Sequence, residues 1–107
     1  MATRLVQLRG LAAADIDAAI DHYQQSAGEA VALDLVDALE HAVTRISRSP
    51  HVGSLRFSHE LAIPELRAWT LQRFPYLIFY VPNDKHIDVW RVLHSRRDIP
   101  SELSRDP

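Results

Sequence analysis

Apolar and polar residues follow different spacings along the chain, and each change of spacing marks a new element. Residues 4–9 alternate weakly and are followed by Gly10, which predicts a short first strand. Residues 11–28 and about 29–47 instead repeat apolar residues every three or four positions, which predicts two amphipathic helices that meet at Gly28. Because this connection is so short, the helices should form an antiparallel hairpin with an apolar seam that needs a sheet to cover it.

Three further strands are predicted near residues 66–71, 76–81 and 86–94, joined by short turns into an antiparallel meander. The last strand is apolar on both faces, which is typical of an inner strand. Strict alternation along it places Ile87, Val89 and Leu93 on one face. The same alternation places Trp90, Val92 and His94 on the other face.

The order strand, helix, helix, strand, strand, strand predicts an α+β fold, with the helical hairpin packed on one face of a small antiparallel sheet. The other face is then free to receive a partner. Residues 49–65 lack sustained periodicity and should form a long loop. Residues 1–100 are predicted to form a single domain, followed by a short polar tail, residues 101–107, that frays or docks loosely.

Composition narrows the function classes. The 107 residues contain no cysteine, which excludes disulfides, thiol nucleophiles and thiolate metal sites. We expect a cytoplasmic protein that does not enter a membrane, because neither an apolar leader nor a spanning run is present. A net charge of −2 argues against broad nucleic-acid binding, and no sequence-specific binding is expected. Residues 1–65 carry a net −4 and residues 66–107 a net +2, so the strand region should be the basic one.

Catalytic motifs are scarce. The six histidines form no metal-binding pattern, so neither a metal nor another cofactor is expected. The three glycines form neither a phosphate-binding loop nor a nucleophile elbow. Acids of the first helix, Asp15, Asp17 and Asp21, are expected to be its solvated face. His94, at the end of the last strand, could act as a general base or could simply be packed there.

What remains is a set of basic and aromatic residues on the sheet. Arginine can stabilise the phosphate charge of RNA during cleavage, and it also anchors acidic protein segments. Alternatively, the aromatic residues belong to the core, and Arg96 and Arg97 cap the strand exit. The members of the set are Arg67, Trp69, Arg73, Tyr76, Tyr80, Trp90, Arg91, Arg96 and Arg97.

Three segments together resemble the ParE toxins of the RelE/ParE superfamily. They are the run from Pro64 to Trp69, the "R-F-P-Y-L-I-F-Y" run from Arg73, and above all the "V-W-R-V-L-H-S-R-R-D-I-P" run that ends at Pro100. The resemblance covers nearly the whole chain. It implies the toxin of a type II toxin–antitoxin pair, held inactive in a hetero-oligomer by a ParD-like antitoxin, which poisons DNA gyrase as its cellular target.

The resemblance leaves the question of enzymatic activity open, leaning towards a non-enzymatic binding toxin. Under that hypothesis the residue set above, apart from Tyr76, contacts a protein partner. The related RelE toxins instead cleave messenger RNA on the ribosome, with basic residues and a C-terminal tyrosine. This chain departs from that pattern, because Lys85 is its only lysine and no tyrosine follows Tyr80. The alternative function is therefore a ribonuclease that uses His94, Arg73 and Arg91.

Overall fold

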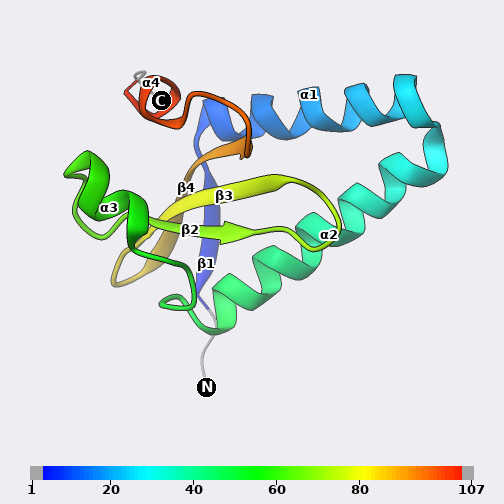
Figure 1. Cartoon of the computed structure of the whole chain (residues 1–107). Coiled ribbons are helices and arrows are strands. Elements are labelled where there is room, and N and C mark those ends of the chain that lie inside the picture. The colour runs from blue at the N-terminus through cyan, green and yellow to red at the C-terminus, as the bar shows by residue number, and fades with distance from the viewer. Residues whose placement is uncertain (1–3, 105–107) are drawn as a thin grey trace.

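A computed structural model describes residues 4–104 of the chain. Its four-stranded sheet has the strand order β1-β4-β3-β2, and helices pack against it (Figure 1). The α+β class is confirmed, and so is the antiparallel meander of the last three strands. The first strand lies beside β4 and runs parallel to it, so the sheet is mixed and not, as had been predicted, antiparallel throughout. The elements are β1 (Leu5–Leu8), α1 (Gly10–Ala27), α2 (Glu29–Arg48), α3 (Arg56–Leu61), β2 (Arg67–Thr70), β3 (Tyr76–Pro82), β4 (His86–His94) and α4 (Ile99–Leu103).

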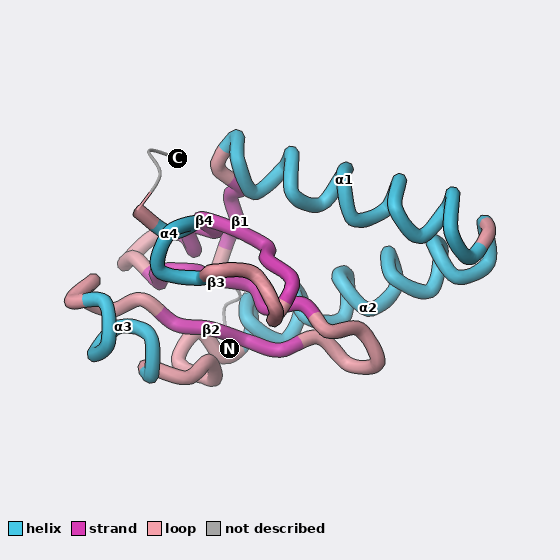
Figure 2. The backbone as a smooth tube through the Cα atoms, turned by 45° about the horizontal axis from the view of Figure 1, so that its top comes forward, coloured by secondary structure: helices cyan, strands magenta, loops and turns pink. Residues whose placement is uncertain are grey.

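The predicted helical hairpin is confirmed. Gly28 is the single residue between α1 and α2, and its φ of 95° is one that side-chain-bearing residues rarely adopt. Leu35 and Ile46 of α2 are buried in the main core cluster together with Ile78 of β3. Figure 2 shows the helices side by side, with their tip projecting beyond the sheet. The outer half of the hairpin is therefore not covered by strands.

The second face of the sheet is covered, contrary to the prediction that it would be free. The stretch expected to be a loop contains α3, whose Phe57 packs edge-on against Phe79 with ring centroids 5.2 Å apart. On the same face, Ile99 and Leu103 of α4 are buried. The expectation of a loosely docked tail is therefore wrong for residues 101–104, and the rest of that tail lies outside the described residues.

A β-bulge in β4 changes which residues face which core. The pairing register shifts between Phe79 and Tyr80, which leaves Trp90 as an extra residue in β4. Ile87, Val89 and Val92 consequently belong to the cluster under the hairpin. Leu93 and Trp90 pack into the cluster under α3 and α4. Strict alternation had assigned Leu93 and Val92 to the wrong faces.

Tyr80 fastens the segment before α3 to the sheet. Its side chain is fully buried, its hydroxyl donates a hydrogen bond to the Pro50 carbonyl at 2.8 Å, and it accepts one from the Gly53 amide at 3.0 Å. Burial raises the pKa of Tyr80, although the Gly53 hydrogen bond and the Arg67 charge act in the opposite direction. Tyr80 therefore has no surface to offer a partner in this structure, contrary to its predicted role.

Replacing Gly53 by alanine should destabilise the protein by about 1–3 kcal/mol. The added Cβ would lie 2.7 Å from the Tyr80 hydroxyl oxygen and 3.0 Å from the Arg67 Cβ, so it would displace the tyrosine from its hydrogen bonds. Urea unfolding measures the change. Gly10→Ala is the matched control, because no atom lies within 4 Å of its added Cβ, and it should leave stability unchanged or slightly raised.

Candidate functional site

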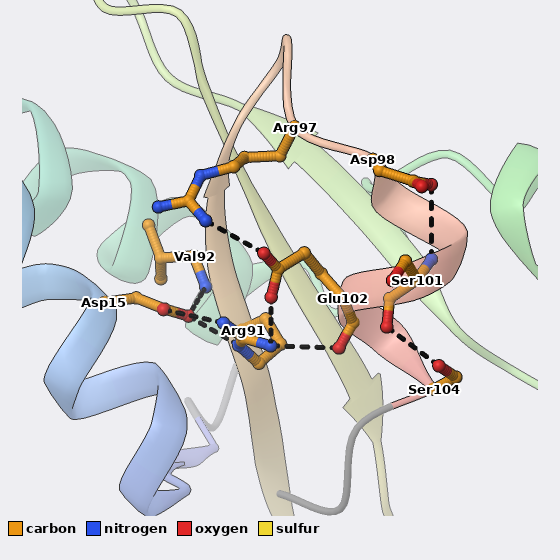
Figure 3. Close-up of polar contacts among 8 residues, drawn as sticks. All are labelled: Asp15, Arg91, Val92, Arg97, Asp98, Ser101, Glu102 and Ser104. Carbon is orange, nitrogen blue, oxygen red and sulfur yellow. Dashed lines mark hydrogen bonds and ion pairs between the residues drawn. The ribbon is translucent and has the colours of Figure 1, made fainter.

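The guanidinium of Arg91 lies at the centre of a buried charge network (Figure 3). Asp15 of α1 binds it with both carboxylate oxygens, at 2.7 Å to Nε and 2.9 Å to Nη2. Glu102 of α4 accepts from Nη1 through its Oε1 at 3.2 Å and its backbone carbonyl at 2.9 Å. The Asp15 hydrogen bonds raise the pKa of Arg91 against the effect of burial, and the charges of Asp15 and Glu102 add to the rise. Since its side chain is only 5% exposed, Arg91 cannot meet a partner or a phosphate, contrary to both predicted roles.

Glu102 joins this network to the surface. Its Oε2 accepts from Nη1 of Arg97 at 2.9 Å, while Oε1 binds Arg91. Burial alone would raise the pKa of Glu102, but the charges and hydrogen bonds of the two arginines outweigh it and lower the pKa below its ordinary value. Helix α4, which has only five residues, is thus held by charge as well as by its apolar side chains.

This depressed pKa predicts how acid acts on the protein. The stability that ionised Glu102 contributes is complete above the ordinary glutamate pKa of about 4.3, and it is lost as the pH falls through the lower native pKa. The stability difference between wild type and Glu102→Gln should therefore stay constant from about pH 7 down to the ordinary glutamate pKa and shrink as the pH falls below it, as followed by urea unfolding. Glu60→Gln, in an exposed pair with Arg56, is the control, and its difference from wild type should stay near zero throughout. A difference for Glu102→Gln that did not change with pH would contradict this.

Trp90 is held in place rather than presented freely. The Arg9 guanidinium lies 4.3 Å from the centroid of its ring, and the same arginine binds Asp88 at 2.7 Å. The indole Nε1 donates to Asp88 at 3.1 Å. The half-buried ring can therefore offer one edge to a partner but forms part of a closed group of three side chains.

Three of the predicted arginines collect at one end of the sheet, which we call the arginine end: Arg73, Arg96 and Arg97. The backbone brings them there, because the Ser95 amide donates to the Pro75 carbonyl at 2.8 Å and so joins the β2–β3 turn to the exit of β4. All three are exposed. Arg73 makes only a long contact of 3.8 Å to Asp34, and its φ is 68°.

His94 lies beside the arginine end but has an ordinary structural environment. Its Nδ1 accepts the Arg96 amide at 3.1 Å, and its ring packs edge-on against Tyr76 at 5.2 Å. Burial raises the pKa of Tyr76, the nearby Tyr23 adds to the rise, and Arg97 opposes it. The catalytic set considered for a ribonuclease is therefore incomplete, because Arg91 is neutralised elsewhere.

The remaining predicted contacts lie on β2, away from the arginine end. Arg67 donates to the carbonyls of His51 and Gly53 at 2.9 and 2.8 Å, so it holds the segment before α3 against the sheet. Trp69 is partly buried against the core under the hairpin. Neither is free in the way that Arg96 is, so the sheet residues singled out from the sequence do not form one surface.

Two hollows follow the seam of α1 and α2, and neither was predicted from the sequence. A first hollow of about 190 Å³ lies between the hairpin and the sheet, and a second of about 260 Å³ lies between the two helices. They follow one another because Ile16 and Ile20 are one turn apart on α1, as Leu39 and Val36 are on α2. We call the two hollows together the hairpin groove. Its lining residues are Val6, Leu8, Ile16, Ile20, Gln24, Glu29, Ala32, Leu33, Val36, Leu39, Val43, Ile78, Val89 and Val92.

Large apolar side chains are exposed in and beside this groove. Leu8 is 46% exposed and Leu33 is 56% exposed, and both line it. Leu5 of β1 is 64% exposed as well, but it lies on the opposite face of the strand from Leu8 and does not line the groove. Exposed apolar side chains that line a hollow are suited to contact with a partner.

Two further observations bound what the described residues can do. Between residues 4 and 104, no group of three or more histidine and acidic side chains is arranged to hold a metal ion. No helix within that range is both long and apolar enough to cross a bilayer.

The mixed sheet, the helical hairpin and the arginine end define a small α+β protein with the RelE/ParE-like fold. The family described as "ParE toxin of type II toxin-antitoxin system, parDE" matches residues 6–99, and the chain belongs to this family. A solved structure titled "Chromosomal ParDE TA system from P. aeruginosa" is 28% identical, with a TM-score of 0.71, over 86% of this chain and 96% of that one. Comparison with curated protein sequences gives no match.

Proposed function

We propose that this ParE-family protein is a growth-arresting toxin that a ParD-type antitoxin neutralises by filling the hairpin groove. The observation that carries the proposal is the groove itself, an apolar channel with Leu8 and Leu33 uncovered on a protein of 107 residues. An amphipathic helix laid in such a groove would remove those side chains from water. Family membership supports an antitoxin as the occupant.

We further propose that the toxin acts by binding DNA gyrase and not by catalysis. The resemblance of the β4 segment to ParE toxins supports gyrase as the target. The arginine end supports a protein contact, because three exposed arginines beside a rigid strand suit a carboxylate-rich surface. The ribonuclease alternative is weakened, because Arg91 already has two carboxylate partners and 5% exposure.

The test adds the purified toxin to a gyrase supercoiling reaction and, separately, to a translating extract. We expect supercoiling to be inhibited, the antitoxin to reverse that inhibition, and the messenger RNA to remain intact. Supercoiling activity that is unaffected by excess toxin would overturn the gyrase proposal. Cleavage of the messenger RNA would favour the ribonuclease function. Expression of the toxin alone should arrest growth; continued growth would show that it no longer acts as a toxin.

A double replacement at the arginine end, Arg96→Ala with Arg97→Ala, extends this test. Neither side chain is buried, so the fold should remain intact. We expect the variant to weaken gyrase inhibition or antitoxin affinity roughly tenfold, as for loss of charged interface contacts. If both activities were unchanged, the arginine end would have no role in binding.

A further inference from the structure

The hairpin is strongly acidic, which limits what can occupy its groove. Residues 10–44 contain seven acidic residues and no lysine or arginine. Two of the acids have an arginine beside them, since Asp15 binds Arg91 and Asp34 lies 3.8 Å from Arg73. Along the described chain the other five are exposed and have no ion pair. They are Asp17, Asp21, Glu29, Asp37 and Glu40.

These acids lie along the rims of the groove. Glu29 lines the second hollow directly. On α2, Glu40 is four residues after Val36 and three before Val43, both of which line the groove, so the three share one side of the helix. Asp37 follows Leu33 by four residues and is therefore its neighbour on the surface of α2, farther from the groove than Leu33.

The opposite rim, on α1, also carries acidic side chains. Asp17 precedes Ile20 by three residues, and Asp21 precedes Gln24 by three, so each acid neighbours a residue that lines the second hollow. An apolar channel is thus bordered on both helices by negative charge, and no basic residue of residues 10–44 balances it.

We infer that the segment filling the hairpin groove is a basic amphipathic helix, with an apolar stripe flanked on both sides by lysine or arginine. This rests on the proposed function, because it specifies the antitoxin segment that would bind there. Acidic residues on that helix would face five unbalanced carboxylates, and like charges placed together cost affinity. From Glu29 to Val43 the groove spans roughly 20 Å at 1.5 Å per residue, which suits a helix of about 14 residues.

Exposed arginines suit an acidic segment of the antitoxin. Because the hairpin is itself acidic, such a segment would bind only at the arginine end. Arg96 and Arg97 are exposed there, just after the end of β4. The antitoxin must therefore carry opposite charges to the two surfaces. Such a pattern would set its register on the toxin as well as its affinity.

The experiment measures binding of a ParD-type antitoxin to wild-type toxin and to a Glu29→Lys, Glu40→Lys double variant. We expect affinity to fall at least tenfold at about 50 mM salt and the loss to shrink near 500 mM, since salt screens exposed charges. Asp84→Lys, an exposed acid in the β3–β4 turn, is the control and should bind like wild type. Equal or tighter binding by the double variant would overturn the inference, whereas failure of the wild type to bind would overturn the proposed function.

A second measurement needs no toxin variant. Two helical peptides of about 20 residues share one leucine stripe, and one carries lysine and the other glutamate beside it. The lysine peptide should bind wild-type toxin at least tenfold more tightly at low salt and should be displaced by the antitoxin. Equal affinities, or a preference for the glutamate peptide, would show that the acidic rims do not select the occupant.

Discussion

Replacing Asp15 by alanine should lower the free energy of unfolding by about 3–5 kcal/mol, which is the cost of leaving a buried charge without its partner. Asp15 supplies two of the hydrogen bonds to the Arg91 guanidinium, and its Oδ2 also accepts the Val92 amide at 3.0 Å. Removing it leaves Glu102 as the remaining carboxylate at Arg91 and leaves a backbone amide unpaired. Urea unfolding followed by circular dichroism measures the loss.

Asp17→Ala is the matched control, because Asp17 is exposed on the same helix and should change stability by less than about 0.5 kcal/mol. A loss below about 1 kcal/mol for Asp15→Ala would mean that water or Glu102 replaces the aspartate. The paired change Asp15→Leu with Arg91→Met should cost less than Asp15→Ala, because no unpaired guanidinium remains.

The second large effect concerns binding. Leu8→Glu should weaken the antitoxin complex roughly 30- to 100-fold, as for a residue central to an apolar interface. Leu8 lines the first hollow from an edge strand and is already half exposed, so the substitution should leave the fold intact while placing a carboxylate in an apolar channel. Isothermal titration calorimetry measures the affinity.

Leu5→Glu is the matched control for that variant. Leu5 is on β1 too, but alternation along the strand turns it away from Leu8, and it does not line the groove. In cells, toxin carrying Leu8→Glu should arrest growth even when the antitoxin is present, while Leu5→Glu should remain neutralised. Full neutralisation of Leu8→Glu would exclude the groove as the antitoxin site.

Sequence periodicity predicted the parts of the fold that are long or locally connected. The hairpin and the three-strand meander were found because each repeats its pattern over several turns or pairs. Helices α3 and α4 were missed because six and five residues are too few to show a helical period. The bulge at Trp90 was missed because it depends on register with β3, which one strand's sequence does not contain.

The candidate site was harder to predict, because its key contacts join distant positions. Asp15 and Arg91 are 76 residues apart in the sequence. Neither segment alone indicates that these two side chains form an ion pair. One signal was available: Asp15 is three residues after Ala12 and four before Ala19, both buried, so it lies on the apolar stripe and not on the solvated face. Arg73, Arg96 and Arg97 are exposed, as expected for residues at turns after strands, and their contact with a partner stays a prediction.

The parallel pairing of β1 with β4 determines when the protein can complete its fold during translation. Arg9 and Asp88, which bind each other beside these strands, are 79 positions apart, so the first strand can pair only after the last strand has been made. Until β4 leaves the ribosome, the hairpin lacks one of the two inner strands on which it packs, and the arginine end does not yet exist. We therefore expect nascent and prematurely terminated chains to be harmless, so that the antitoxin need only capture finished molecules.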